Sequence, residues 1–435
     1  MSVSYIKNQT VMSFISHASV LLNYNDELII TDPWYISSAF NTWWPCPPPI
    51  YNIDMLIGLI KSKKLKILIS HAHPDHIDRD FIKLVPKDTK IFIPKYKDSH
   101  FIDILESLGM KNIIEITNRG VQEGNYNLNY YSHYDSDYDA AISIETPDAF
   151  IFHGNDSWRI KKEAENKIRL KLKEINKASL FMGQGGSASG YPLTYLSYDK
   201  ADLDSILIEK NNKMIKSLEN TASSCGFDNI LAYACFSNIN IKGKMYSNRS
   251  PIPTAHYCNE ISNSNKFLDL SPGDIFLPKK NKGIIIPLMK SLHVNQKNFY
   301  KNNNIYTWPE FKGNIDDLKN KAIKFCKEFE YFLENKKNNS KIDIMEIGIE
   351  FRFVIIDEKE NIISEIRHSY FDNVAGRIKI CKVRASVLDE VLNGNIPFED
   401  LSIGYLAEWD RIPNNKYNKE FISHIKTFWN IYVST

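Results

Sequence analysis

The first 280 residues alternate short apolar runs with polar turns. Several runs are rich in β-branched residues and end where Asn, Asp, Gly or Pro favours a turn. The strands predicted from this pattern are Phe14–Leu22, Leu28–Thr31, Leu65–Ser70, Thr89–Pro94, Ile113–Thr117, Tyr126–Tyr131, Ala141–Glu145 and Ala149–Phe152. Helical spacing of apolar residues separates some of them, as at Phe101–Leu108. The alternation predicts a layered α/β domain.

Longer helical patterns follow these strands. Residues 158–177 carry many charges, and their apolar positions recur at roughly helical spacing. We interpret them as an amphipathic helix that covers a sheet, in preference to a stripe that binds nucleic acid. A strand at Ser179–Met182, a helix at about Asp202–Cys225 and a strand at Ile230–Ala234 come next.

The pattern changes after Asp274. A strong helical pattern at Asp316–Asn335 precedes two paired strand patterns, Ile344–Ile356 and Ile362–Arg367. We predict three parts: a layered catalytic domain over residues 1–280, a helical connection over residues 281–336, and a small α+β region over residues 337–435. The last part covers the active site, shapes substrate entry or supports a dimer.

The composition is that of a large globular protein. The chain has 435 residues, 43% of them hydrophobic, and a formal net charge of +2. So small a charge favours neither nucleic acid nor a membrane surface as a partner. No apolar stretch approaches the ~18 residues of a transmembrane helix, and the N-terminus shows no apolar signal segment. We therefore expect a cytoplasmic protein with no nucleic-acid or membrane partner.

Six cysteines are spread along the chain without close spacing. They are Cys46, Cys225, Cys235, Cys258, Cys326 and Cys381. No CxxC or CxH pair occurs, which argues against a zinc knuckle, an iron–sulfur cluster and a disulfide scaffold.

The segment HAHPDH, residues 71–76, directly follows a predicted strand. On extended backbone, side chains two residues apart point the same way, so the imidazoles of His71 and His73 face one side. Asp75 and His76 lie on the turn or helix start that follows. Imidazole suits zinc, iron and manganese, and a carboxylate adds negative charge that favours a divalent cation. We predict that these four side chains bind two divalent metal ions, iron or zinc.

This HxHxDH segment resembles the signature of the metallo-β-lactamase superfamily, and Asp32 in ITDP matches the aspartate that ends an early strand in that family. The resemblance implies a four-layer αβ/βα sandwich, here with a C-terminal α+β extension. It also implies further metal ligands: His133 matches a histidine on a later strand, and Asp156 matches an aspartate that bridges both ions. For the last histidine we favour His256, with His293 as the alternative. A bridging carboxylate partly neutralises both cations and fixes their spacing near ~3.5–4 Å.

Two more histidines lie near this set. His153 precedes Asp156 by three residues, and we place it behind the ligands rather than on a metal. His17, in ISHASVLL, resembles a family segment close to the site, where it supports the ligands, faces the substrate or serves the structure. Asp75 and His17 are the residues that we expect to take part in catalysis.

Other segments narrow the resemblance. TDPWYISSAFNTWWP, FHGNDSW, GQGGSASGYPLTY and LDLSPGDIF resemble the catalytic part of the CMP-N-acetylneuraminate hydroxylases and related bacterial proteins. That group is similar to a non-haem iron oxygenase on a hydrolase-like scaffold, and many members carry a Rieske cluster. A Rieske centre needs paired cysteine and histidine ligands, which this chain lacks. A separate protein or small reductant must therefore donate the electrons for an oxidation.

The same ligands suit two reactions. Zinc lowers the pKa of a bound water toward ~7, which makes a nucleophile for an ester, lactone, amide or phosphodiester. Iron with open coordination positions binds dioxygen and hydroxylates a C–H bond. We favour a di-iron oxygenase that acts on a sugar nucleotide or a similar polar metabolite. The alternatives are a zinc hydrolase and a non-catalytic binding module.

The substrate is expected to be a small molecule. In the glycine-rich loop after Met182, Gln184, Ser187 and Tyr191 are candidate substrate contacts, because backbone amides in such a loop suit an anion. A plain turn is the alternative. Trp34 and Trp43, on a proline-rich loop, either wall the mouth of the site or pack an edge.

Overall fold

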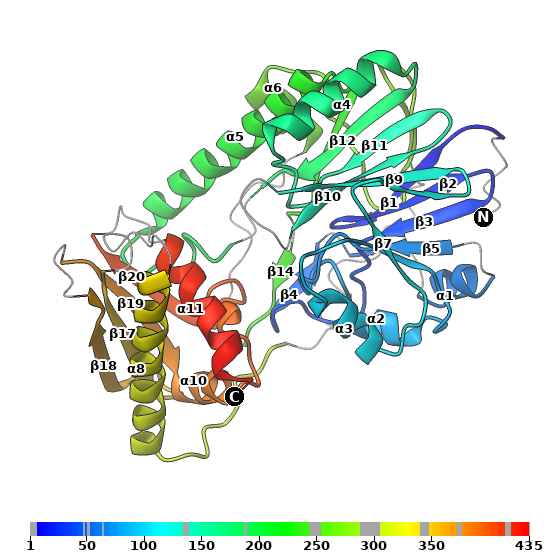
Figure 1. Ribbon diagram of the computed structural model, residues 1–435. Helices are drawn as coiled ribbons and strands as arrows, with labels where there is room; N and C mark the ends of the chain where they lie inside the picture. The colour runs from blue at the N-terminus through cyan, green and yellow to red at the C-terminus, as the bar shows by residue number, and fades with distance from the viewer. Residues whose placement is uncertain are drawn as a thin grey trace.

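The computed structural model describes residues 7–46, 48–49, 53–62, 65–133, 139–186, 189–235, 237–242, 254–287, 305–339, 348–371, 376–413 and 419–434. Within them, two β-sheets lie face to face, and helices cover the outer face of each sheet (Figure 1). A smaller sheet with its own helices forms the C-terminal part. The predicted four-layer αβ/βα sandwich with a C-terminal α+β extension is therefore confirmed.

The first sheet has eight strands in the order β16-β15-β1-β2-β3-β5-β6-β7. They are β1 (Val11–Ser16), β2 (Ser19–Tyr24), β3 (Glu27–Thr31), β5 (Leu65–Leu68), β6 (Ile91–Pro94), β7 (Ile113–Ile116), β15 (Ile275–Leu277) and β16 (Ile284–Ile286). The strands from β3 to β7 pair in parallel, and the others pair antiparallel.

The second sheet has six strands in the order β13-β12-β11-β10-β9-β8. They are β8 (Val121–Glu123), β9 (Tyr126–Ser132), β10 (Ala140–Glu145), β11 (Ala149–His153), β12 (Ala178–Gln184) and β13 (Asn229–Tyr233). β11, β12 and β13 are parallel to one another, whereas β8, β9 and β10 form antiparallel hairpins.

Each strand of the first sheet contributes to two apolar layers, because successive side chains point to opposite faces. Leu68 packs between the two sheets, whereas Ile67 and Ile69 pack beneath the helices. The helices over this outer face are α1 (Ile53–Lys61), α2 (Arg79–Leu84) and α3 (His100–Ser107). The second sheet is covered by α4 (Lys162–Glu174), α5 (Lys200–Cys225) and α6 (Ala255–Ser262).

Parallel pairing collects the loops that carry chemistry at one edge of the sandwich. In the first sheet, Thr31 of β3 pairs with Leu68 of β5, so Asp32 and the loop that starts at Ser70 leave the sheet side by side. In the second sheet, β11 ends at His153 and leads to Asp156. Ligand sites of α/β sheets commonly lie at the carboxyl ends of parallel strands.

The C-terminal part is built around a sheet of four strands in the order β18-β17-β19-β20. They are β17 (Glu350–Ile356), β18 (Ile362–Ser369), β19 (Ile378–Arg384) and β20 (Ala407–Ile412). The helices α8 (Ile315–Asn339), α10 (Ala385–Leu392), the 3₁₀ helix η3 (Phe398–Leu401) and α11 (Lys419–Tyr432) share one apolar core with it. A two-stranded ribbon of β4 (Trp43–Pro45) and β14 (Ser237–Ile239) lies between the two parts (Figure 1).

One predicted strand differs from the structure in a way that matters for the site. The run Phe14–Leu22 is two strands, because the chain reverses at His17 between β1 and β2. His17 has a φ of 45°, in the left-handed region that few residues other than glycine adopt. Both flanking strands are almost wholly buried. The apolar run is therefore continuous in sequence although the backbone turns.

The domain boundaries near residues 280 and 337 stay predictions. β16 carries the first sheet as far as Ile286. The helix α8 packs its apolar side chains, among them Phe325 and Leu333, into the C-terminal core. The first residues of the predicted strand Ile344–Ile356 lie outside the described residues.

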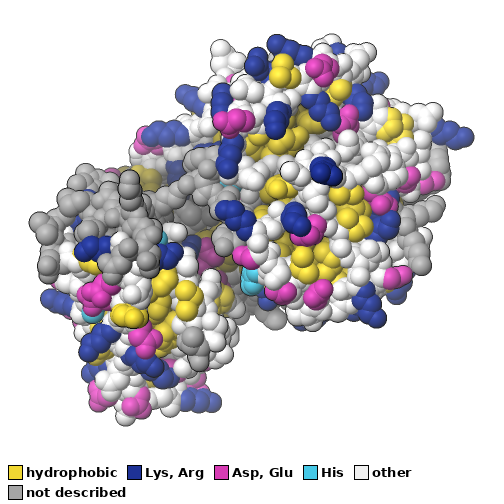
Figure 2. Space-filling model, in the orientation of Figure 1, with side chains coloured by type: hydrophobic (Ala, Val, Ile, Leu, Met, Phe, Trp, Pro, Cys, Tyr) yellow, Lys and Arg dark blue, Asp and Glu magenta, His cyan; other side chains and the backbone are white. Residues whose placement is uncertain are grey.

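The surface shows no single-signed stripe on the face in Figure 2, where lysine and arginine side chains alternate with aspartate and glutamate. Among the described residues, no helix has both the length and the apolar character needed to cross a bilayer.

Candidate metal centre

The loop after β5 holds four predicted ligands in one tight turn. His76 donates its backbone N–H to the carbonyl of His73 at 2.9 Å. Asp78 then caps α2 by accepting the N–H of Phe81 at 3.1 Å, and its other oxygen accepts the N–H of Tyr35 at 2.9 Å. Because Tyr35 belongs to the loop after β3, this carboxylate ties the two loops together and fixes the turn that bears the ligands.

Three groups of side chains bring possible ligand atoms within 4.8 Å of one another. The groups are His17, Asp75 and His76; His71, His73 and Asp139; and His71, His76 and Asp156. The third group shares His76 with the first and His71 with the second. The structure therefore contains two candidate cation sites joined by Asp156.

Asp156 lies between the two sites. Its Oδ1 is 3.5 Å from Nε2 of His71, and its Oδ2 is 3.8 Å from Nε2 of His76. The Nδ1 of His73 is 3.9 Å from the same Oδ2. One carboxylate whose two oxygens face separate imidazoles has the placement of a bridging ligand.

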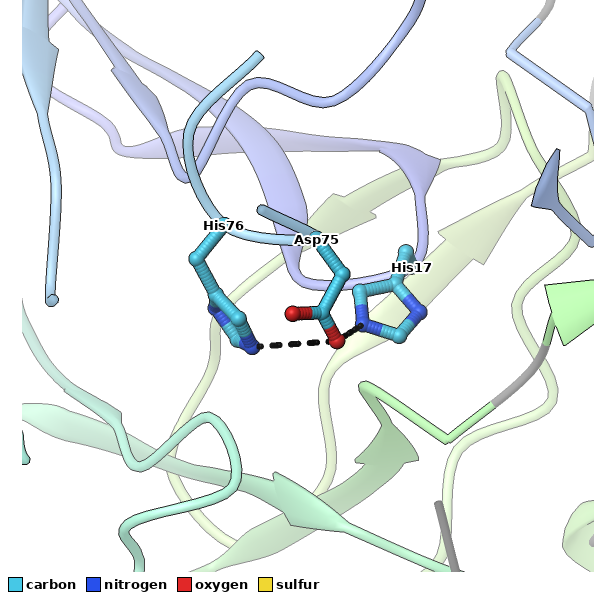
Figure 3. A group of neighbouring side chains, drawn as sticks. All are labelled: His17, Asp75 and His76. Carbon is cyan, nitrogen blue, oxygen red and sulfur yellow. Dashed lines mark ion pairs between the residues drawn. The ribbon is translucent and has the colours of Figure 1, made fainter. Parts of the chain in front are cut away.

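Asp75 occupies the centre of the other group (Figure 3). Its Oδ2 is 3.3 Å from Nε2 of His17 and 3.8 Å from Nε2 of His76. The three side chains come from two places in the fold: His17 from the β1–β2 turn, and Asp75 and His76 from the loop after β5. The left-handed backbone at His17 is what turns its ring toward Asp75.

Buried polar atoms test whether these residues fit a metal. Among the described residues, Oδ1 of Asp75 and Nε2 of His76 are both buried and make no hydrogen bond. A buried polar atom without a partner costs about 1–3 kcal/mol, and buried groups of this kind are normally satisfied. Cations coordinated at these atoms would remove that cost. The buried histidine and aspartate groups are therefore typical of a dinuclear metal centre.

Asp32 stands behind the ligands and orients one of them. Its fully buried carboxylate accepts from Nδ1 of His76 at 2.8 Å and from Nε2 of His153 at 2.9 Å. The N–H and hydroxyl of Ser70 also donate to it, both at 2.7 Å. Burial alone would raise the pKa of Asp32, but the two histidines hold it well below its usual range. A carboxylate on Nδ1 leaves Nε2 of His76 directed at the metal site.

Replacing Asp32 by asparagine is expected to weaken metal binding by about 10–100-fold, because the substitution keeps the shape and removes the charge behind His76. Competition with a chelator of known affinity measures the change. Asp80→Asn is the matched control, since its side chain is 53% exposed on α2. Equal metal affinity in the two variants would contradict the role given to Asp32.

Carboxylates dominate the electrostatics of the centre. Burial by itself lowers the pKa of His76, but nearby carboxylates, above all Asp75 and Asp156, outweigh burial and raise that pKa to about 9. The ring of His71 responds mainly to burial, which lowers its pKa to about 4 and favours the neutral form that binds metals. The centre as a whole therefore attracts positive charge.

Not every predicted ligand joins these groups. His133 ends the β9 side of the β9–β10 hairpin, and its N–H donates to the carbonyl of Asp139 at 3.1 Å, but its side chain belongs to none of the three groups. His256 lies exposed in the first turn of α6, on the helical layer outside the second sheet. His293 lies outside the described residues.

His153 forms hydrogen bonds with both ring nitrogens, one with Asp32 and one with the hydroxyl of Tyr233 at 2.5 Å, so it stands behind the ligands.

Asp139 is the ligand candidate that the sequence interpretation missed. It directly precedes β10 and meets His71 and His73 from the second sheet. The available signal was an aspartate at the start of a buried strand, in the same hairpin as His133. That signal is weak, because the segment YDSDYD contains three alternating aspartates.

The predicted substrate contacts divide into two sets. Trp34 and Trp43 are both buried. The ring of Trp34 contacts the ring of His17 edge-on at a centroid distance of 5.0 Å, and Trp43 packs in a small apolar cluster with Phe40 of the same loop.

Gln184 ends β12 close to the loop that carries Asp156, and its backbone N–H donates to the carbonyl of Asn155 at 2.8 Å. Ser187 lies outside the described residues. Tyr191 lines a different cavity, at the junction with the C-terminal part.

No family model matches the chain. The chain is 28% identical over 193 residues to the cytidine monophosphate-N-acetylneuraminic acid hydroxylase of Cricetulus griseus, which covers 42% of this chain and 32% of that protein. A protein of Mycolicibacterium smegmatis, named as a possible Rieske 2Fe-2S iron-sulfur protein, is 29% identical over 104 residues, or 24% of this chain and 19% of that protein. The chain thus matches a third or less of the length of these curated relatives.

Solved structures give more distant likenesses. A possible metal-dependent hydrolase from Veillonella parvula is 13% identical with a TM-score of 0.42, over 61% of this chain and 98% of that one. CmlA, a di-iron β-hydroxylase from Streptomyces venezuelae, is 13% identical with a TM-score of 0.38, over 65% of this chain and 54% of that one.

Proposed function

We propose that this chain, a metal-dependent enzyme of the metallo-β-lactamase fold, is a non-haem di-iron oxygenase that hydroxylates a sugar nucleotide or a similar polar metabolite. The observation that carries the proposal is the donor set. His71, His73 and Asp139 form one group of two histidines and one carboxylate, and His17, His76 and Asp75 form a second such group. Two histidines and one carboxylate, with open positions, are the ligands typical of non-haem iron oxygenases. The similarity to a hydroxylase over 42% of the chain supports the same choice.

Iron bound in these groups would supply the binding and reduction of dioxygen. Hydroxylation converts a C–H bond and one O₂ into a C–OH group and one water, and it consumes two electrons and two protons. Among the residues that the structure describes, no cysteine forms a disulfide and none belongs to a group of possible metal ligands. We propose a separate electron-transfer protein or a small reductant as the source of the electrons.

The chain's own residues position the ligands and limit water at the centre. Asp32 orients His76, and Asp156 links the two cation sites. The rings of Trp34 and Phe40 lie beside the centre, with Phe40 at 6.4 Å from the ring of His73. An apolar wall of this kind lowers the local dielectric and protects a reactive site from side reactions with solvent.

A zinc hydrolase is the alternative function, because imidazole and carboxylate ligands also bind zinc. Elemental analysis of protein purified without chelators, combined with oxygen uptake in the presence of a reductant, separates the two. We expect iron at up to two equivalents per chain, and oxygen consumption that falls to background when the metal is removed. The opposite result has three parts: zinc as the bound metal, no oxygen consumption, and turnover of an ester or phosphodiester under anaerobic conditions. That result would contradict the oxygenase and support the hydrolase.

A further inference from the structure

A cavity of about 390 Å³ lies where the sandwich meets the C-terminal sheet. The segment after β12 reaches across to that sheet: Leu196 donates its N–H to the carbonyl of Trp409 at 2.9 Å, and Trp409 donates to the carbonyl of Thr194 at 2.8 Å. Four basic side chains line the cavity, namely Lys210, Lys379, Arg411 and Lys426. Among the described residues that line it, none is an aspartate or a glutamate.

Lys379, on β19, is the most deeply buried of these cations. Only 2% of the residue is exposed, and its Nζ donates one hydrogen bond, to the hydroxyl of Tyr195 at 2.7 Å. Within the described part of the chain it has no carboxylate partner, and burial lowers its pKa to about 7. An ammonium group is costly to bury without a counter-charge. This side chain is therefore placed for an anion that the described residues do not provide.

Lys210 approaches the same cavity from the sandwich. It extends from α5, and its Nζ donates to Oγ of Ser189 at 3.0 Å and to the carbonyl of Tyr191 at 3.2 Å. Both acceptors are uncharged, and no carboxylate among the described residues pairs with it. Burial lowers the pKa of Lys210 to about 8. Two lysines from separate parts of the fold thus share one cavity without a counter-ion from described residues.

The aromatic rings of the cavity hold the cations in place. Nζ of Lys379 lies 5.0 Å from the ring centroids of both Tyr195 and Trp409. The guanidinium of Arg411 lies 4.8 Å from the ring of Tyr191 and 5.2 Å from that of Tyr195. Cation–π contacts fix a charge without neutralising it. Because these ring faces are already in contact with cations, the cavity selects a ligand by charge rather than by stacking on a planar base.

We propose that this cavity binds the phosphate group of a small molecule. A phosphate dianion has enough oxygens and charge to meet several lysine and arginine donors at once, which a single carboxylate does not. The cavity lining continues to a loop beside the metal centre. Ser402 and Ile403 line the cavity, and the hydroxyl of Thr42 donates to the carbonyl of the nearby Gly404 at 2.8 Å. The ring of Phe40, on the same loop as Thr42, lies 6.4 Å from that of His73. A ligand held by its phosphate here lies next to the loop that borders the metal centre, whichever reaction that centre performs.

Calorimetric titration of the full chain with inorganic phosphate tests the proposal. We expect binding to the wild type, and affinities at least ~10-fold weaker in Lys379→Met and in Lys210→Met, since each variant removes one charge-assisted contact to the phosphate. Lys213→Met is the matched control, because it lies on the same helix as Lys210 with 74% of its side chain exposed. Acetate at equal ionic strength is expected to bind more weakly than phosphate.

Any of three results would overturn the proposal. The wild type does not bind phosphate, the two lysine variants bind it as tightly as the control does, or acetate binds as tightly as phosphate. Should Lys379→Met fail to fold by circular dichroism, Lys210→Met decides, because Lys210 is only half-buried whereas Lys379 is almost fully buried. Elemental analysis of the same samples distinguishes a failure of the proposed oxygenase function from a failure of the proposed phosphate site. Zinc in place of iron would count against the oxygenase alone, and lysine-independent phosphate binding would count against the cavity alone.

Discussion

Asp156→Ala is expected to remove at least one of the two metal equivalents and to lower turnover by about three orders of magnitude. The two oxygens of Asp156 face His71 at 3.5 Å and His76 at 3.8 Å, so both cation sites lose a ligand at once. A metal ion supplies several kcal/mol of stabilisation to a reacting oxygen, and each 1.36 kcal/mol is tenfold in rate. Elemental analysis and oxygen uptake measure the two effects.

Folding is expected to survive this substitution. The side chain of Asp156 is 27% exposed. Besides its contacts with the histidines of the centre, it accepts one long hydrogen bond, from the hydroxyl of Ser157 at 3.4 Å. The matched control is Asp80→Ala, on the exposed side of α2, which should leave metal content and turnover unchanged. Two full metal equivalents in Asp156→Ala would show that Asp156 does not bridge the sites.

Four of the candidate ligands could be grouped from the sequence because they lie close together in the chain. In residues 71–76, a strand end and one turn place four donors together, so spacing alone implies a shared site. Strand positions were predictable for a similar reason: apolar residues buried on both faces, such as those of β6 and β11, form short continuous runs. The layered fold follows from those runs and the amphipathic helices between them.

The distant part of the centre depends on tertiary pairing, which spacing does not show. His17 reaches Asp75 only because the backbone reverses at a left-handed residue inside an apolar run. Asp139 reaches His71 only because the β9–β10 hairpin of one sheet faces the edge of the other. His256 has the residue type of a ligand, but its place in the first turn of α6 leaves it on the exposed helical layer.

The cavity between the sandwich and the C-terminal sheet could not be predicted from the sequence for a related reason. Lys210 and Lys379 are 169 positions apart in the sequence. Lys210 lies on α5 of the sandwich, and Lys379 lies on β19 of the C-terminal sheet. In sequence, each is one lysine among 54 basic residues, so neither is distinguished by its neighbours. Burial without a carboxylate partner is what singles them out, and burial is a property of the packed fold.

Asp139→Ala compared with His133→Ala is the sharpest test of how the second cation site is completed. We expect Asp139→Ala to lose about one metal equivalent and most of the turnover, because its carboxylate is the third donor beside His71 and His73. His133→Ala is expected to keep both equivalents, since the side chain of His133 belongs to none of the three groups of possible ligands, and alanine retains its backbone hydrogen bond to Asp139. His133 directly follows β9 and Asp139 directly precedes β10, so each variant controls for local disturbance of the same hairpin by the other.

The reverse result would restore the ligand that the family resemblance implied. If His133→Ala loses a metal equivalent and Asp139→Ala does not, the second site holds three histidines, and the case for two histidines and one carboxylate falls for that site. Three imidazoles with a bridging carboxylate suit zinc as well as iron. The pair of substitutions therefore tests the donor set on which the choice between oxygenase and hydrolase depends.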